Sequence, residues 1–252
     1  MNHNVREGER IDDLQRNRWK ILQNPKKFCF GMDAVLLSSF AVIRSGEKVL
    51  DLGTGTGVLP LLLAAKTPGE HFTGLEIQPD MADMAFRSVR MNEAQDRIEI
   101  LTGDLREASR IFGRASFDVV VSNPPYMKPG CGKMSPEEPQ SIARCEILCT
   151  LEDVIREAAA CLRPGGRFYL VHRPHRLAEI FQQLAAYGLE PKRLRFVHTH
   201  SDREAKMVLL ESSRGGGAFL RVEPPLIIYE KPGVYTEEVR RIYENPEEEE
   251  EE

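Results

Sequence analysis

The stretch Lys48-Val-Leu-Asp-Leu-Gly-Thr-Gly-Thr-Gly57 decides the fold. Its first five residues predict a short buried strand, and the glycine turn leads directly into an apolar helix expected over 58–66. Glycines at a strand-to-helix turn let a ligand approach the backbone closely, and open α/β sheets bind ligands beyond the carboxyl ends of their strands. The stretch therefore predicts a ligand site at the end of this strand.

After this stretch the chain alternates short apolar runs with amphipathic ones, which is typical of strands joined by crossover helices. Helices are expected over 80–93 and 151–162, and Pro164-Gly-Gly166 is expected to end the second of them. Near-continuous apolar strands favour a parallel sheet that is covered on both faces. The further strands of this kind are expected at 72–77, 98–102, 117–122 and 167–172.

Two more apolar runs, 193–198 and 206–211, are separated by only a short turn. Parallel strands need a crossover of a dozen or more residues, so these two are expected to be antiparallel neighbours. The predicted fold class is α/β, a doubly wound, mostly parallel seven-stranded sheet with an antiparallel last strand. We expect a basic N-terminal segment with a first helix (1–45) to pack on this domain (46–243), and an acidic disordered tail (244–252) to follow.

The charge of the chain is set by its tail. The 34 Lys and Arg residues face 39 Asp and Glu residues, which gives a formal net charge of −5. Seven of those acids, Glu244 and the run from Glu247 to Glu252, lie in the last nine residues, and the rest of the chain is slightly basic. A nucleic acid partner is therefore compatible with the composition.

Five cysteines are an odd number, and they show neither paired C-x-x-C spacing nor a histidine at zinc-ligand spacing. No secretory leader is recognisable at the first residues, and no apolar run is long enough to span a bilayer. We therefore expect a cytoplasmic protein with reduced thiols, no bound metal and no membrane association. The cysteines are Cys29, Cys131, Cys145, Cys149 and Cys161.

Acidic side chains lie near the carboxyl ends of the first three predicted strands. Asp51 precedes the glycine turn, Glu76 lies 25 residues further on, and Asp104 follows the third strand. A nicotinamide dehydrogenase would also have a glycine turn and an acid at about this distance, but its glycines are spaced G-x-G-x-x-G and bind a pyrophosphate. Here the spacing is G-x-G-x-G. A carboxylate at Asp51 repels a pyrophosphate and attracts an ammonium group.

The predicted strand 117–122 ends in Ser122-Asn-Pro-Pro-Tyr126, which is the most specific motif in the chain. Neither proline has an N–H group, so ladder bonding stops, and their restricted φ angles make a rigid bend. A rigid bend leaves the Asn123 side chain and nearby carbonyl groups available to a ligand.

The glycine turn and the three acids resemble the class I methyltransferases that use S-adenosyl-L-methionine (AdoMet) and release S-adenosyl-L-homocysteine. The resemblance implies that Asp51, Gly53 and Gly55 line the methionine part of AdoMet. It further implies that Glu76 contacts the ribose and that Asp104 lies beside the adenine, with Ile77 and Leu105 also binding the cofactor. Each acid could also be a structural cap.

The tetrapeptide Asn123-Pro-Pro-Tyr126 resembles the signature of methyltransferases that modify planar amino groups. On that resemblance Asn123 and the Pro124 carbonyl accept the two hydrogens of the amine, with Pro125 holding the bend and Asn123 also near the cofactor. The two acceptors would stabilise the charge that develops as the nitrogen is methylated. Tyr126 would stack on the base.

Relatives with this signature modify adenine in DNA, adenine or guanine in RNA, or a glutamine amide in release factors. The length leaves no room for a DNA target-recognition domain, and no helical domain precedes the core, so RNA is favoured. A protein glutamine or another RNA base is the enzymatic alternative. An AdoMet-binding RNA chaperone is the non-enzymatic one, disfavoured because residues 123–126 are intact. The oligomeric state is left open.

Over about residues 10–243 the chain resembles the bacterial tRNA1(Val) adenine-37 N6-methyltransferases. Stretches that carry this resemblance are 28–37, 123–130, 142–146, 151–154 and 223–229. It implies that Gly31 and Asp33 lie near the methionine end of AdoMet, and that Cys145 stands where a histidine is expected. The predicted substrate is therefore an adenosine of tRNA, adenosine 37 of tRNA1(Val).

Basic residues near the N-terminus and after the strand at 167–172 are the candidate contacts to RNA phosphates. Trp19 and Phe28 are interleaved with the N-terminal group, which strengthens its case over that of any single charge. The candidates are Arg16, Arg18, Lys20, Lys26, Lys27, Arg173 and Arg176.

Overall fold

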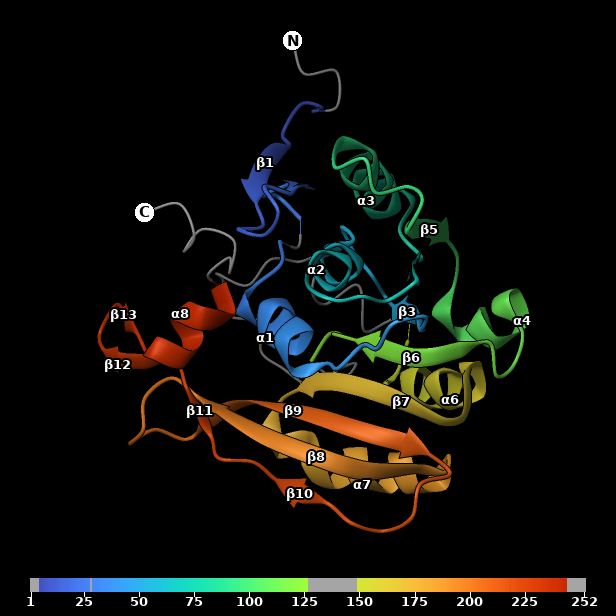
Figure 1. The fold of residues 1–252 in the computed structure, drawn as a ribbon, viewed down its shortest axis with the longest axis vertical. Coiled ribbons are helices and arrows are strands. Elements are labelled where there is room, and N and C mark those ends of the chain that lie inside the picture. Colours follow the sequence, from blue (N-terminus) through green and yellow to red (C-terminus); the bar gives the residue numbers. More distant parts are fainter. Residues whose placement is uncertain (1–4, 28, 127–148, 244–252) are drawn as a thin grey trace.

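The computed structural model describes residues 5–27, 29–126 and 149–243, and at its centre is a twisted sheet with helices on both faces (Figure 1). The seven expected strands lie in the order β5-β4-β3-β6-β7-β9-β8. Only β9 runs antiparallel to its two neighbours, β7 and β8. The predicted fold class is thereby confirmed. The strands are β3 (Lys48–Leu52), β4 (His71–Glu76), β5 (Ile98–Thr102), β6 (Phe117–Ser122), β7 (Leu162–His172), β8 (Leu189–His198) and β9 (Ala205–Arg214).

Both faces of the central strands are buried, as a parallel sheet requires. In β3, Val49 belongs to the core on one face and Leu50 to the core on the other. The first core is covered by α1 (Met32–Phe40), α2 (Val58–Lys66) and α3 (Pro79–Met91). The second is covered by α4 (Ala108–Phe112), α6 (Leu151–Cys161) and α7 (Leu177–Ala186), and short turns η1 (Leu105–Glu107) and η2 (Pro174–Arg176) lead into α4 and α7.

Short strands extend the sheet beyond β8. β10 (Arg221–Val222) and β11 (Leu226–Ile227) both pair with β8 and bring the sheet to nine strands. The chain then forms a small hairpin of β12 (Tyr229–Lys231) and β13 (Val234–Tyr235), followed by α8 (Glu237–Tyr243). Helix α8 contacts α1 and so returns the C-terminal segment to the first face of the sheet.

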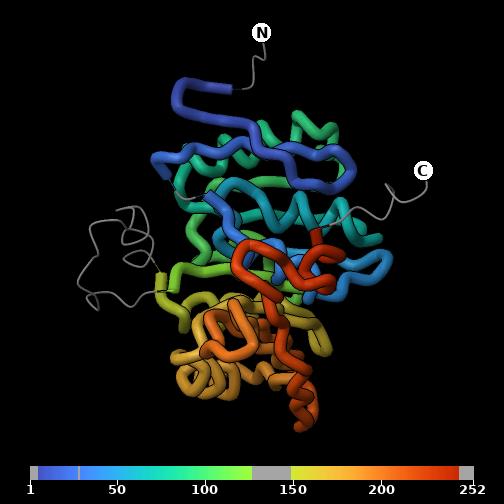
Figure 2. Tube along the Cα trace, turned by 90° about the vertical axis from the view of Figure 1, so that its left-hand side faces the viewer, coloured from blue at the N-terminus to red at the C-terminus, as the bar shows by residue number. Residues whose placement is uncertain are grey.

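The N-terminal segment forms a β-hairpin that the sequence analysis did not predict. Strands β1 (Arg10–Asp13) and β2 (Lys20–Gln23) pair antiparallel, and Figure 2 shows this hairpin in front of α3. Both strands are mostly polar and give no apolar pattern from which a strand could be predicted; in the two strands, only Ile21 and Leu22 of β2 are fully buried apolar side chains. The Leu22 N–H group donates to Ser88 Oγ at 2.9 Å, which fixes β2 against α3.

The Pro164-Gly-Gly166 segment lies inside β7 and does not separate a helix from a later strand as expected. Phe117 is in register with Leu162 and Val119 with Arg167, so β7 has extra residues that bulge out of the ladder. Gly165 has φ of +78°, a conformation that glycine adopts without strain. The strand therefore begins directly after α6.

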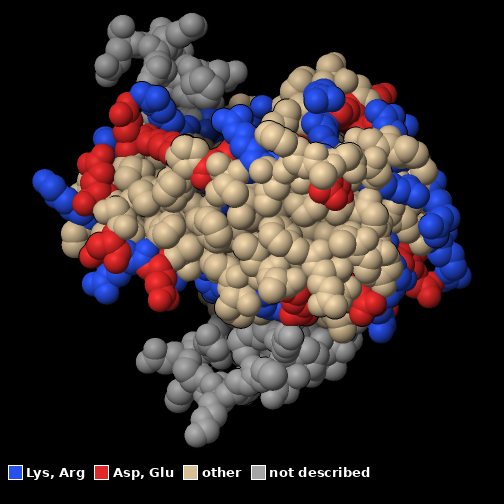
Figure 3. All heavy atoms as spheres, turned by 90° about the horizontal axis from the view of Figure 1, so that it is seen from below, with Lys and Arg blue, Asp and Glu red and all other residues tan. Residues whose placement is uncertain are grey.

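Charged side chains of both signs share the face nearest β10 (Figure 3). Lys and Arg gather towards the two ends of this face beside Asp and Glu, and its centre is largely uncharged. In the described part of the chain, no helix combines the length and apolar character needed to cross a membrane.

Candidate active site

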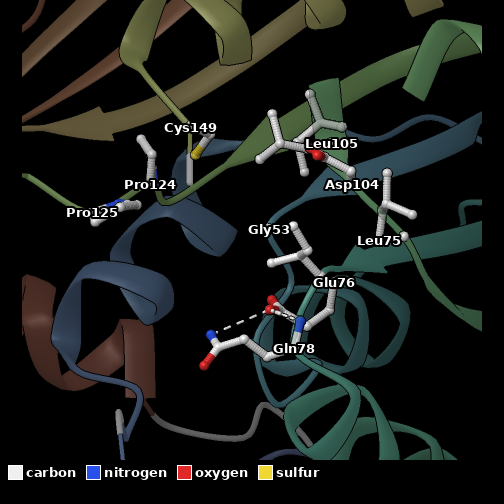
Figure 4. Close-up of a pocket in the computed structure, with 12 residues that line it drawn as sticks. Gly53, Leu75, Glu76, Gln78, Asp104, Leu105, Pro124, Pro125 and Cys149 are labelled. Carbon is white, nitrogen blue, oxygen red and sulfur yellow. Dashed lines mark hydrogen bonds between the residues drawn. The ribbon is translucent and has the colours of Figure 1, made fainter. Parts of the chain in front are cut away.

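A pocket lies at the carboxyl ends of β3, β4, β5 and β6, where a doubly wound sheet binds its ligand (Figure 4). Seven residues expected at the cofactor or the target amine line it: Gly53, Glu76, Ile77, Asp104, Leu105, Pro124 and Pro125. Sequence reasoning missed the other five lining residues: Leu52, Leu75, Gln78, Gly103 and Cys149. Gln78 could have been anticipated from its place two residues after Glu76, whereas nothing in the sequence marked Cys149.

The glycine turn is tied to the end of β4 through Glu76. One carboxylate oxygen, Oε2, accepts from the Gly55 N–H group at 2.8 Å, and Oε1 accepts from the Gln78 N–H group at 2.9 Å. Gly53 has φ of +79°, which lets the chain turn sharply beside the pocket. Oε1 also accepts a longer bond, 3.4 Å, from the Gln78 side-chain amide, so these bonds hold Glu76 at the pocket wall and leave Oε2 with a single donor among the described residues.

Asp51 is a buried carboxylate with no ion pair among the described residues. It is 1% exposed, and neither oxygen has a well-formed hydrogen bond to them, although the Thr54 hydroxyl lies beside it. Burial, assisted by the nearby Glu76, raises the pKa of Asp51 to about 7. A buried carboxylate with free acceptors is a suitable partner for a ligand ammonium group.

Asp104 is already paired in this structure. Its Oδ1 accepts from the Arg106 N–H group at 2.9 Å and so caps η1, and the Arg106 side chain also donates to the carboxylate. The hydrogen bonds from the Arg106 side chain lower the pKa of Asp104. The carboxylate borders the pocket and remains ionised there.

A second group of residues forms around the rigid bend after β6. The Tyr126 hydroxyl lies 2.7 Å from Asn123 Oδ1 and 2.7 Å from Asp33 Oδ2. Gly31 caps the start of α1 and so brings Asp33 to this point. Burial, with a contribution from Asp33, raises the pKa of Tyr126, so its hydroxyl stays protonated. A hydroxyl has one hydrogen, so Tyr126 can donate to only one of the two acceptors at a time.

The Tyr126 ring is contacted by two residues at the end of β7. The Arg173 guanidinium carbon lies 4.7 Å from the ring centroid, and the His172 ring lies 5.3 Å away in an edge arrangement. The Arg173 guanidinium also donates to the Lys206 carbonyl at 3.1 Å. The expected RNA contact Arg173 is thus next to the expected stacking residue.

Burial corrects part of the expected RNA-binding set. Arg16 and Arg176 are 8% and 7% exposed; Arg16 donates to the carbonyl of Ile242, and Arg176 pairs with Glu179. Both side chains are largely shielded from solvent in this structure. Lys27 pairs with Asp80. Arg18, Lys20 and Lys26 are exposed, and no ion pair to them is found among the described residues.

Four expected features lie outside the described residues: Phe28, Cys131, the departure at Cys145 and the tail 244–252. Within 5–27, 29–126 and 149–243, no three His, Cys, Asp or Glu side chains are grouped so that they could hold a metal ion.

The antiparallel strand β9 between β7 and β8, with the pocket after β3 to β6, defines a Rossmann-like methyltransferase. Residues 30–187 match the family described as methyltransferase small domain. A predicted O-methyltransferase from Agrobacterium tumefaciens superposes with a TM-score of 0.69 and 26% identity over 84% of this chain and 95% of that one. The TYW2 protein of P. horikoshii, solved with MeSAdo, shares the fold at 15% identity, with a TM-score of 0.59 over 84% and 73%.

Relatives with a more specific name match nearly the whole chain. A tRNA1(Val) (adenine(37)-N6)-methyltransferase of Porphyromonas gingivalis is 34% identical over 92% of this chain and 94% of its own length. One from Mannheimia succiniciproducens is 31% identical over 82% and 83%. The chain belongs to the methyltransferase small domain family and, within it, to the tRNA1(Val) (adenine(37)-N6)-methyltransferases, which confirms the resemblance seen in the sequence.

Proposed function

We propose that this protein transfers the methyl group of AdoMet to the N6 amine of adenosine 37 in tRNA1(Val). The observation that carries the proposal is the near full-length similarity to relatives of that name, together with Asn123 and Tyr126 beside the pocket. AdoMet, when bound, supplies a methyl group activated by its sulfonium.

The residues present fit AdoMet. The orphaned carboxylate of Asp51 would pair with the ammonium of the methionine part, and this pairing would restore its negative charge. Glu76 would accept hydrogen bonds from the ribose hydroxyls: Oε2 has one donor among the described residues, and Oε1 could exchange its long bond from the Gln78 side chain. Leu105 and Ile77 would give the adenine apolar walls, with Asp104 at their edge.

The target amine would exchange places with the Tyr126 hydroxyl. Asn123 Oδ1 and the Pro124 carbonyl would accept the two amine hydrogens, which directs the nitrogen lone pair towards the methyl group. When the amine donates to Asn123 Oδ1, the Tyr126 hydroxyl is left with Asp33 as its acceptor. Asp33 would then be a positioning residue that keeps the Tyr126 ring in place for stacking.

RNA binding would draw on exposed cations. Arg18, Lys20 and Lys26 on the N-terminal segment can reach phosphates, and Arg173 lies beside Tyr126. An anticodon-loop base is single-stranded, so extruding it costs less than flipping a base out of a duplex. Since its proposed substrate is tRNA, we place the protein in the cytoplasm.

Mass spectrometry of ribonuclease fragments of the tRNA and of peptides of a release factor tests the proposal. Bulk tRNA and a purified release factor would be incubated separately with isotopically labelled AdoMet and either the wild-type protein or Asn123→Ala. We expect labelled N6-methyladenosine at position 37 of tRNA1(Val) with the wild type and almost none with the variant. Label on a release-factor glutamine, or on another tRNA nucleotide, would overturn it.

A further inference from the structure

His172 is the last residue of β7, and its surroundings define which of its two ring nitrogens carries the hydrogen. Its Nδ1 lies 2.7 Å from the backbone N–H group of Arg173. A backbone amide can only donate, so Nδ1 is the acceptor. Burial, with help from the neighbouring Arg176 and His175, lowers the pKa of His172 to about 3, so the ring is neutral. The single ring hydrogen of a neutral imidazole must then be on Nε2.

This Nε2–H group has no partner in the part of the chain that the structure describes. The His172 side chain is 0% exposed, and its Nε2 makes no hydrogen bond to any described residue. Burying a donor without an acceptor costs free energy, so natural proteins retain few such groups. A donor kept in this state at the end of a strand suits an acceptor that arrives with the substrate.

The position of His172 favours the target base as that acceptor. Strands β6 and β7 are parallel neighbours with Ser122 opposite Leu170, so the chain that leaves β6 and the end of β7 run side by side. The His172 ring consequently contacts the ring of Tyr126, whose hydroxyl reaches Asn123. The ring that carries this donor is therefore in contact with Tyr126, the residue that would stack on the base and that itself reaches Asn123.

We propose that the Nε2–H group of His172 donates a hydrogen bond to a ring nitrogen of the target adenine, N1 or N7, which makes His172 a specificity-determining residue. The inference rests on the proposed function. Both nitrogens flank the N6 amine and are acceptors. A contact to N1 would also reject guanine, because the N1 atom of guanine carries a hydrogen.

Atomic substitution in the RNA tests this contact. tRNA1(Val) would be assembled with adenosine, 1-deazaadenosine or 7-deazaadenosine at position 37, and single-turnover methylation would be measured for the wild type, His172→Phe and His172→Gln. We expect one analogue to slow the wild type about 10- to 100-fold, and His172→Phe to slow adenosine by a similar factor. In His172→Phe that same analogue should reduce the methylation rate little further, because the His172 donor that would contact the missing ring nitrogen is already absent. His172→Gln, which retains a donor, should recover part of the rate.

Structural effects are separated by two controls. His172→Phe removes an unsatisfied polar group, so its melting temperature and AdoMet affinity should match or exceed those of the wild type. His71→Phe, at the opposite end of the sheet, should change no rate. Equal analogue effects in the wild type and His172→Phe, or no effect of either analogue on the wild type, would overturn the inference. A wild type that leaves adenosine 37 unmethylated would overturn the proposed function itself, and the inference with it.

Discussion

At the end of β3, Asp51 holds an ionisable group where water does not reach it. Its pKa is about 7 in the ligand-free protein, against about 4 for an exposed aspartate. The folded state therefore holds a proton that the unfolded state releases between about pH 4 and pH 7, and stability from this group falls as the pH rises through that window. The loss is on the order of a few kcal/mol.

Asp51→Asn should accordingly separate stability from binding. At pH 8 the ligand-free variant should melt at the same temperature as the wild type or higher, because no buried carboxylate ionises. Its AdoMet affinity, measured by calorimetry, should fall at least about 10-fold, because the pairing with the ammonium is lost. At pH 5 the Asp51 carboxyl group of the wild type is mostly protonated in the free protein, so the difference in AdoMet affinity between the wild type and Asp51→Asn should be smaller. A difference in affinity that does not change with pH would contradict this role of Asp51.

Tyr126 offers a second test at the level of one side chain. Tyr126→Ala should reduce turnover on tRNA about 10- to 100-fold, because base stacking contributes about 1–3 kcal/mol. Tyr126→Phe keeps the ring and removes only the hydroxyl, which lies within hydrogen-bond distance of Asn123 and Asp33. Its turnover on tRNA should therefore stay within about 3-fold of the wild type. Single-turnover methylation measures both. If Tyr126→Phe lost as much as Tyr126→Ala, the hydroxyl and not the ring would be the important group.

Among the elements, the N-terminal hairpin and α8 are joined through one side chain. Arg16 lies in the turn between β1 and β2, and its guanidinium donates to the carbonyls of Arg241 and Ile242 at the end of α8. A cation at the carboxyl end of a helix satisfies its last carbonyls and interacts favourably with the helix dipole. Arg16 thus connects the two ends of the chain across the first face of the sheet.

Arg16→Ala should lower the free energy of unfolding by about 1–3 kcal/mol, since it removes charged hydrogen bonds from a buried site. Arg18→Ala, two residues away and exposed, is the matched control and should stay within about 0.5 kcal/mol of the wild type. Urea denaturation measures both. Equal stability of the two variants would show that Arg16 does not hold the hairpin to α8.

Over the whole molecule, the exposed cations of the hairpin segment lie far from the mixed-charge face near β10 (Figures 1 and 3). Binding of tRNA through phosphates releases counterions, so affinity should fall steeply with salt concentration. Several cations near the N-terminus are paired internally, such as Arg6 with Asp83 and Arg10 with Asp12. Arg18 and Lys26 are therefore better choices for a test than the paired Lys27.

The double variant Arg18→Glu, Lys26→Glu should weaken tRNA binding at least about 10-fold and reduce its dependence on salt, with AdoMet affinity unchanged. Filter binding over a salt series measures this. Charge reversal at Arg221, in β10 on the mixed-charge face, is the control and should not change how tRNA affinity depends on salt concentration. A larger effect at Arg221 than in the double variant would place the RNA surface on the opposite side.

The sequence by itself determined the strands from β3 to β9 and the helices α2, α3 and α6 between them, and with these the edge of the sheet where the site lies; α4 and α7 were not predicted. Apolar runs, glycine turns and prolines act through nearby backbone geometry, so they can be read locally. The residues after β3, β4, β5 and β6 were expected together for that reason, and seven of them line one pocket.

Tertiary structure alone decided what depends on contacts between distant segments. The polar hairpin at 10–23 is stable because α3 covers it, and Pro164-Gly-Gly166 stays within β7 because β6 holds the strand on both sides of the bulge. Burial then changed roles that residue type suggested. Arg16 became an anchor for α8, and His172 acquired an unpaired donor beside Tyr126. The solvent accessibility and the pKa of a side chain depend on its environment in the folded protein, and that environment forms only when the chain folds.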